Sequence, residues 1–107
     1  MTQYRQGELI LQRIADDTSL AAEVLPVDGQ LILAHSESGH HHFVSAKMAR
    51  LFESGEPGVR ICKIGVGGGL VEHGRVGGHT PITLPEGTYR VSQKRQYTPN
   101  GWEPVRD

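Results

Sequence analysis

Three imidazoles and a carboxylate lie within six residues in the first half of the sequence, in the run 37–42 (Glu-Ser-Gly-His-His-His). If this run is extended, the side chains of His40 and His42 point to one face of the strand and that of His41 to the other. Two imidazoles on one face suit a first-row metal ion, whose ligands converge at about 2.0–2.1 Å. Glu37 can add a carboxylate oxygen or a hydrogen bond to a ligand. The spacing therefore predicts a metal site.

Two further histidines, His73 and His79, lie in or beside a glycine-rich stretch, and either can complete a three-imidazole site. We favour His79 and expect His73 to be a solvated loop side chain. A mixed set of imidazoles and a carboxylate suits Zn, Fe, Mn, Ni or Cu, and does not distinguish among them. The predicted metal ligands are His40, His42, His79 and Glu37.

Other side chains that could carry chemistry give weaker signals. His35 follows an apolar run and is expected at a strand end, and His41 is expected on the surface. Cys62 is the single cysteine, and a lone cysteine in a strand is usually a small core residue. The glycine tract lacks the Gly-Lys-Ser/Thr sequence of a phosphate-binding loop. Without a metal, the histidines remain a candidate pH switch of oligomerisation, because an imidazole with a pKa near 6.5 changes charge between about pH 5 and pH 8.

Short extended runs separated by turn signals must position these residues. Asp28-Gly29 is a two-residue hairpin signal, and the segment 47–53 is open between helix and strand. Residues 65–78 hold seven glycines and predict a long, mobile hairpin connection. We expect a mostly β fold, a small antiparallel β-barrel or sandwich, as one domain over residues 1–107. The expected strands are 8–14, 30–35, 41–46, 59–66, 80–84 and 88–97.

Composition excludes several classes of function. The 107 residues carry 11 Lys and Arg against 12 Asp and Glu, a net charge of −1, which argues against binding duplex nucleic acid by bulk electrostatics. One cysteine cannot form an intramolecular disulfide, so a reducing, cytoplasmic location is expected. No apolar run approaches the roughly 20 residues of a membrane span. A small barrel with exposed edges often self-associates, and we expect a homodimer.

The C-terminal part of the chain interleaves cations with aromatic residues, among them Arg90, Arg95, Tyr97 and Trp102. Such a stretch can stack single-stranded bases or anchor a protein partner. It is also typical of a solvated edge strand, in which cations discourage aggregation between sheets.

The histidine pair and a later segment resemble the cupins, small double-sheet β-barrels that bind metal through a His-x-His pair. His40-His41-His42 resembles that pair, and the segment 78–90, which contains Pro85-Glu86-Gly87, resembles the second cupin motif. The last ligand histidine of that motif falls at Arg90. The resemblance implies a double-stranded β-helix with a metal held by His40, His42 and a substitute ligand.

A second resemblance covers most of the chain and joins three segments: 36–42, the His-x-Pro-Ile-x-Leu-Pro-x-Gly-x-Tyr pattern at 79–89, and Arg95-Gln96-Tyr97. These segments resemble a group of small bacterial and phage proteins, in which a Glu replaces Gln96. The resemblance supports the same four ligands. The predicted function is a small metal-binding β-barrel protein whose site is open to a small molecule, and whether it is an enzyme stays open. The alternative is a non-enzymatic, phage- or prophage-encoded module that binds protein or single-stranded nucleic acid.

Overall fold

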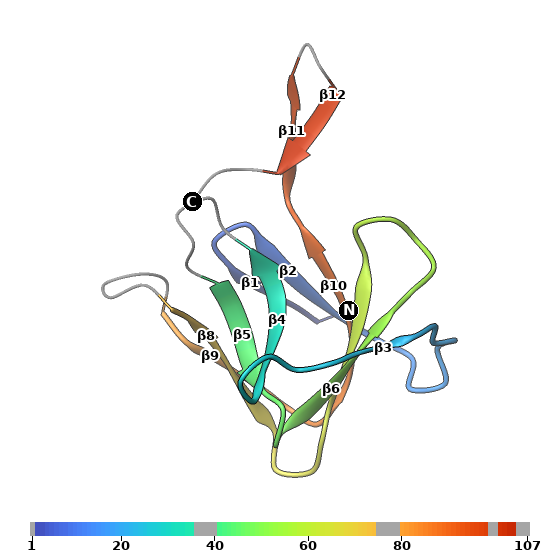
Figure 1. Cartoon of the computed structure of the whole chain (residues 1–107), viewed down its shortest axis with the longest axis vertical. Helices are drawn as coiled ribbons and strands as arrows, with labels where there is room; N and C mark the ends of the chain where they lie inside the picture. Colours follow the sequence, from blue (N-terminus) through green and yellow to red (C-terminus); the bar gives the residue numbers. More distant parts are fainter. Residues whose placement is uncertain (1, 36–40, 75–79, 99–100, 105–107) are drawn as a thin grey trace.

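The chain forms two open antiparallel sheets that face one another, and a separate hairpin (Figure 1). The computed structural model describes residues 2–35, 41–74, 80–98 and 101–104, with the backbone alone of 95–98 and 101–104. No helix occurs in these described stretches. The strands are β1 (Gln3–Gln6), β2 (Leu9–Ile14), β3 (Glu23–Val24), β4 (Gln30–His35), β5 (His41–Ser45), β6 (Ala49–Glu53), β7 (Arg60–Ile64), β8 (Gly69–His73), β9 (Ile82–Leu84), β10 (Gly87–Gln93), β11 (Arg95–Thr98) and β12 (Gly101–Pro104).

The larger sheet has the strand order β1-β2-β10-β7-β6-β3, and the smaller sheet the order β4-β5-β8-β9. Every pairing in both sheets is antiparallel. Each sheet keeps two edge strands, so the arrangement is a sandwich and not a closed barrel. The predicted mostly β class is thereby confirmed, in its sandwich form.

The inward faces of the two sheets share one apolar core. Alternation along β2 and β5 directs every second side chain inward, as the burial of Leu9, Leu11 and Val44 shows. In β4 the register shifts between Ile32 and Ala34, and Leu33 and Ala34 are both buried there. The core cluster consists of Leu9, Leu11, Leu31, Leu33, Ala34, Val44, Ala49, Leu51, Cys62, Ile64, Val71, Leu84, Tyr89 and Val91.

The structure decides one segment that the sequence left open and corrects another. The segment 47–53, open between helix and strand, contains β6, whose residues pair with β7 and whose Ala49 and Leu51 belong to the core cluster. The glycine-rich stretch 65–78 is not one long loop, since it contains β8 between β5 and β9. Val71 is the buried centre of that strand, and Gly69 is also buried. Glycine content alone therefore did not exclude a paired strand.

The predicted turn at Asp28-Gly29 is confirmed by the bridge between Val27 and Gln30. The β11–β12 hairpin forms a two-stranded sheet of its own and stands away from the sandwich (Figure 1). Over the described residues, no helix is long and apolar enough to cross a membrane. The cytoplasmic location and the homodimer stay predictions.

Candidate functional site: a buried polar cluster between the sheets

His42 occupies a core position of β5. Its side chain is fully buried, on the same inward face as Val44, while His41 and Phe43 alternate outward and are half-buried. The expected opposite directions of His41 and His42 are therefore observed. An imidazole at such a position needs hydrogen-bond partners, because burying an unsatisfied polar group costs about 1–3 kcal/mol.

Two buried polar residues beside the turn from β1 to β2 supply those partners. Gln6 and Glu8 are 3% and 4% exposed. Gly7 separates them with a φ of 59°, a left-handed value that favours glycine in a two-residue hairpin turn. Gln6 pairs with Leu9 across this turn. The tight turn thus holds an amide and a carboxylate at one end of the core.

The hydrogen bonds of Gln6 determine how His42 is protonated. Gln6 Nε2 donates to the carbonyls of Val71 and Thr80 at 3.1 and 3.0 Å. Its Oε1 is therefore the acceptor for His42 Nδ1, which lies 2.8 Å away and must carry a hydrogen. The other ring nitrogen, Nε2, faces Oε1 of Glu8 at 3.2 Å.

A proton must lie between His42 and Glu8 for this second contact to be a hydrogen bond. It is carried either by the imidazole, which gives an ion pair, or by the carboxyl group, which gives a neutral pair. The side chains are 0% and 2% exposed, so water does not screen the contact. The arrangement therefore holds a proton, or another cation, between a buried nitrogen and a buried oxygen.

His73 adds a second imidazole to the cluster. It pairs with His42 across β5 and β8, and the ring centroids are 4.6 Å apart at an interplanar angle of 60°. The prediction that His73 is a solvated loop side chain is wrong, because β8 extends to this residue and half-buries it. We refer to Gln6, Glu8, His42 and His73 as the buried polar cluster.

A second histidine pair lies at the same end of the smaller sheet. His35 ends β4 and pairs with His41, with the two Nδ1 atoms 3.1 Å apart. One ring must donate and the other accept, so the contact is lost when both are protonated. Partial burial lowers the pKa of His35, and the neighbouring His41 and the Arg60 guanidinium lower it further.

Three of the four predicted ligands, Glu37, His40 and His79, lie outside the described residues. The ends of the two segments that carry them are described, and these ends converge on the buried polar cluster. The segment 36–40 runs from His35 to His41, which pair with each other. The segment 75–79 begins after Gly74, whose N–H donates to the carbonyl of His41 at 3.0 Å, and ends before Thr80, which accepts from Gln6.

Within the described part of the chain, no group of three or more His, Cys, Asp or Glu side chains is arranged to hold a metal ion. Sequence reasoning missed Gln6 and Glu8. The local signal for them is weak, since a Gln-Gly-Glu turn before an apolar strand is ordinarily solvated. Their distance from His42 along the chain, 36 and 34 residues, hides the contact.

Cys62 is a core residue, as expected. It is fully buried in β7, and burial raises the pKa of its thiol to about 12. A thiol of this kind is a poor nucleophile, because the thiolate is the reactive species.

Comparison with known proteins identifies a family. Residues 5–94 match the model of a family described as a domain of unknown function (DUF8820). The chain belongs to this family. The DUF8820 match spans the buried polar cluster and all four predicted metal ligands, and ends before the β11–β12 hairpin. No curated protein and no solved structure matches this chain.

Proposed function

We propose that this DUF8820 protein binds a divalent first-row metal ion at the end of the sandwich that holds the buried polar cluster. Glu8 and His42 are the inner ligands, and His40 and His79 complete the site from the two neighbouring connections. Glu37 is a further ligand or a hydrogen-bond partner of one. The metal is Zn, Fe, Mn, Ni or Cu, since imidazole and carboxylate ligands suit each of these ions.

The observation that carries the proposal is the contact between Glu8 Oε1 and His42 Nε2. These atoms are 3.2 Å apart, a separation that suits two ligands each about 2.0–2.2 Å from one ion. A metal ion would replace the shared proton in this place. Gln6 supports the same role, since it fixes the hydrogen on Nδ1 and leaves Nε2 to face the carboxylate.

The topology supports the outer ligands. His40 directly precedes His41, and His79 directly precedes Thr80, whose carbonyl accepts from the same Gln6 amide that orients His42. An ion held by these four protein ligands would bind a small molecule as a fifth ligand. The ion would activate a water molecule bound in that position, or polarise an oxygen atom of a bound small molecule.

The proposal is tested by metal analysis of protein made without a polyhistidine tag. The apo protein is incubated with Zn²⁺ or Co²⁺ and desalted, and its metal content is measured. We expect about one ion per chain, with Co²⁺ absorbing as a four-coordinate ion does. Glu8→Gln and His42→Gln keep a polar side chain in the core and should lose the metal. The double variant His40→Ala, His79→Ala leaves the described cluster intact and should bind markedly less tightly.

His41→Ala is the matched control, because His41 neighbours the site without belonging to it, and its metal content should equal that of the wild type. The fold of every variant is checked by NMR. A wild-type protein with below about a tenth of an ion per chain contradicts the proposal. Folded ligand variants that keep the wild-type metal content contradict it as well.

The β11–β12 hairpin favours a second candidate function, binding of single-stranded nucleic acid. The register places Tyr97 opposite Trp102 on a hairpin that stands away from the sandwich. Tyrosine and tryptophan side chains can stack nucleic-acid bases, each stack being worth about 1–3 kcal/mol. Trp102 is the single tryptophan, so its fluorescence reports on binding of an oligothymidylate. We expect quenching that Tyr97→Ala weakens and His42→Gln leaves unchanged. Unquenched fluorescence contradicts this second proposal.

A further inference from the structure

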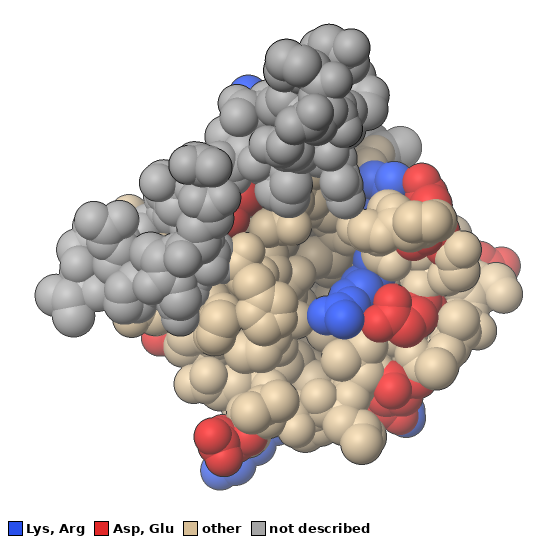
Figure 2. All heavy atoms as spheres, turned by 45° about the horizontal axis from the view of Figure 1, so that its top comes forward, with Lys and Arg blue, Asp and Glu red and all other residues tan. Residues whose placement is uncertain are grey.

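A pocket of about 290 Å³ lies between the two sheets, apart from the buried polar cluster. Its walls come from β4 of the smaller sheet and from β6, β7 and β10 of the larger one. Figure 2 shows this side of the molecule hollowed, with cationic and anionic side chains meeting at the edge of the hollow. The volume is at the lower end of ligand pockets, which limits an occupant to a small molecule.

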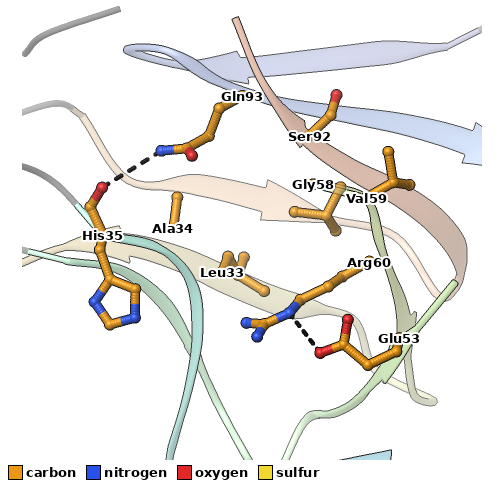
Figure 3. A pocket seen from close by; sticks show the side chains of 10 residues that line it. Leu33, Ala34, His35, Glu53, Gly58, Val59, Arg60, Ser92 and Gln93 are labelled. Atoms are coloured by element: carbon orange, nitrogen blue, oxygen red, sulfur yellow. Dashed lines mark hydrogen bonds and ion pairs between the residues drawn. The ribbon is translucent and has the colours of Figure 1, made fainter. Parts of the chain in front are cut away.

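The pocket has an apolar floor and a polar edge (Figure 3). Leu33, Ala34, Val59 and Val91 form the floor, and all four are buried members of the sandwich interior. This floor offers dispersion contacts to an aliphatic group and no hydrogen bond to a polar one. A ligand that fills the pocket therefore carries an apolar part.

The polar edge consists chiefly of an ion pair. Arg60 Nε donates to Glu53 Oε1 at 3.1 Å, and Arg60 Nη1 donates to the carbonyl of Ile32 at 3.3 Å. These bonds hold the guanidinium beside the pocket and use two of its five N–H donors. Both side chains are partly exposed, at 35% for Arg60 and 47% for Glu53, so a ligand can reach them.

Further along the rim, Gln93 and Ser92 lie on β10 at the other side of the opening (Figure 3). Gln93 Nε2 donates to the carbonyl of His35 at 3.4 Å, which links β10 to the end of β4. This contact closes one end of the pocket. The ion pair of Arg60 and Glu53 remains the charged feature at the other end.

From this geometry we infer that the pocket binds a small zwitterion with an aliphatic side chain, such as a branched-chain α-amino acid. The carboxylate of the ligand meets the guanidinium of Arg60, its ammonium group meets the carboxylate of Glu53, and its side chain lies on Leu33 and Val91. The inference is independent of the proposed metal site.

Charge complementarity selects this ligand class over simpler ones. A simple anion would be attracted by Arg60 and repelled by Glu53. A simple cation would be attracted by Glu53 and repelled by Arg60. A neutral hydrocarbon would fill the floor and leave the ion pair desolvated at the edge. A molecule with an adjacent carboxylate and ammonium group satisfies both charges at once and keeps an apolar end for the floor.

The inference is tested by NMR titration of the intact protein with three probes: L-leucine, 4-methylpentanoate, which lacks only the ammonium group, and isopentylamine, which lacks only the carboxylate. L-leucine should shift resonances of residues that line the pocket, and the other two probes should bind about fivefold or more weakly. Arg60→Gln and Glu53→Gln should each weaken L-leucine binding by about fivefold or more. Arg50→Gln is the matched control, because Arg50 forms an ion pair with Glu23 away from the pocket and should leave binding unchanged.

Equal binding of 4-methylpentanoate and L-leucine would overturn the zwitterion assignment in favour of a simple carboxylate. Shifts that survive in both Arg60→Gln and Glu53→Gln would overturn the role of the ion pair. If millimolar L-leucine does not shift the NMR resonances of residues that line the pocket, the inference is overturned altogether. Metal-loaded and metal-free protein should bind L-leucine alike, which separates this test from that of the proposed metal site.

Discussion

His42 shows how one buried polar side chain depends on its partners. Its contact with Glu8 is shielded from water, and in either protonation state the desolvation of the two polar groups offsets much of their attraction. The pair therefore adds little net stability while it is complete. Removal of one member has a large effect, since the other is left in the core.

The first prediction follows from that asymmetry. His42→Ala leaves Glu8 buried without the imidazole and opens a cavity, so we expect a loss of about 3–5 kcal/mol in the free energy of unfolding. His41→Ala, on the outward side of the same strand, should cost below about 1 kcal/mol. Urea unfolding of the two variants measures both values, and equal losses would contradict the interior role of His42.

Cys62 leads to a second prediction at the scale of single residues. Burial raises the pKa of its thiol to about 12, so the thiolate is scarce at pH 8 and iodoacetamide has no access to it. We expect alkylation of the native protein to be slower by at least about a hundredfold than alkylation in denaturant. Mass spectrometry follows the reaction, and rapid labelling under native conditions would show that β7 opens readily.

At the scale of elements, the connection between β7 and β8 depends on close approach of two backbones. A Cβ added at Gly68 would lie 2.8 Å from the carbonyl oxygen of Leu84 on the neighbouring β9, while Gly67 has open space around it. Both glycines have a left-handed φ, at 82° and 94°. The two positions share the same backbone strain and differ in the steric clash.

These two glycines give the third prediction. Gly67→Ala should lower the free energy of unfolding by about 1 kcal/mol, through its left-handed φ alone. Gly68→Ala should lower it by about twice that or more, because the added methyl group also clashes with the Leu84 carbonyl, which belongs to a paired strand. Thermal unfolding of both variants measures the difference. Equal effects would show that β9 shifts freely to accommodate the methyl group.

The connection after β2 is held by Asp16, which links it to β10. The hydroxyl of Thr88 donates to Asp16 at 3.0 Å, and this bond, followed by that from Arg13, holds the pKa of the Asp16 carboxyl below its usual 3.8. A lowered folded pKa means that the contribution to stability is complete above the unfolded pKa and is lost as pH falls through the folded value.

The fourth prediction concerns that pH window. The difference in unfolding free energy between wild type and Asp16→Asn should be largest above about pH 5 and should shrink as the pH falls towards about 2. Thr88→Val removes the principal hydrogen bond and should reduce the same pH dependence. Urea unfolding at a series of pH values measures the difference, and a constant difference over that range contradicts the assignment.

At the scale of the whole molecule, the sandwich and the β11–β12 hairpin are distinct sheets. The hairpin strands pair with each other, while the family match ends at residue 94. The backbone N–H of Lys94 still donates to the carbonyl of Glu8 at 2.7 Å, so a chain that ends there keeps this contact.

The fifth prediction is that a chain truncated after Lys94 folds as the full chain does. We expect its melting temperature to change by less than about 5 °C, which corresponds to about 1 kcal/mol for a domain of this size. Circular dichroism measures the transition. Loss of cooperative unfolding would show that the hairpin supports the sandwich.

Several local features of this protein follow directly from its amino-acid sequence. It predicted the β class, the hairpin turn at Asp28-Gly29, the opposite directions of His41 and His42, and the core position of Cys62. All of these depend on side-chain alternation or on the conformational preference of a few adjacent residues. Short-range geometry is sufficient for them, because a strand alternates in the same way whichever strand it pairs with.

Contacts between residues far apart in the chain become visible only in the folded molecule. The fold brought Gln6 and Glu8 to His42, paired β8 with β5, and placed Arg60 and Glu53 beside an apolar floor to which both sheets contribute. Strand order and sheet packing follow from the burial of the whole core, because which strands pair depends on all the segments together and cannot be read from any single one. Alternation predicted the opposite directions of His41 and His42, while the neighbours of these two side chains in space are decided by the fold.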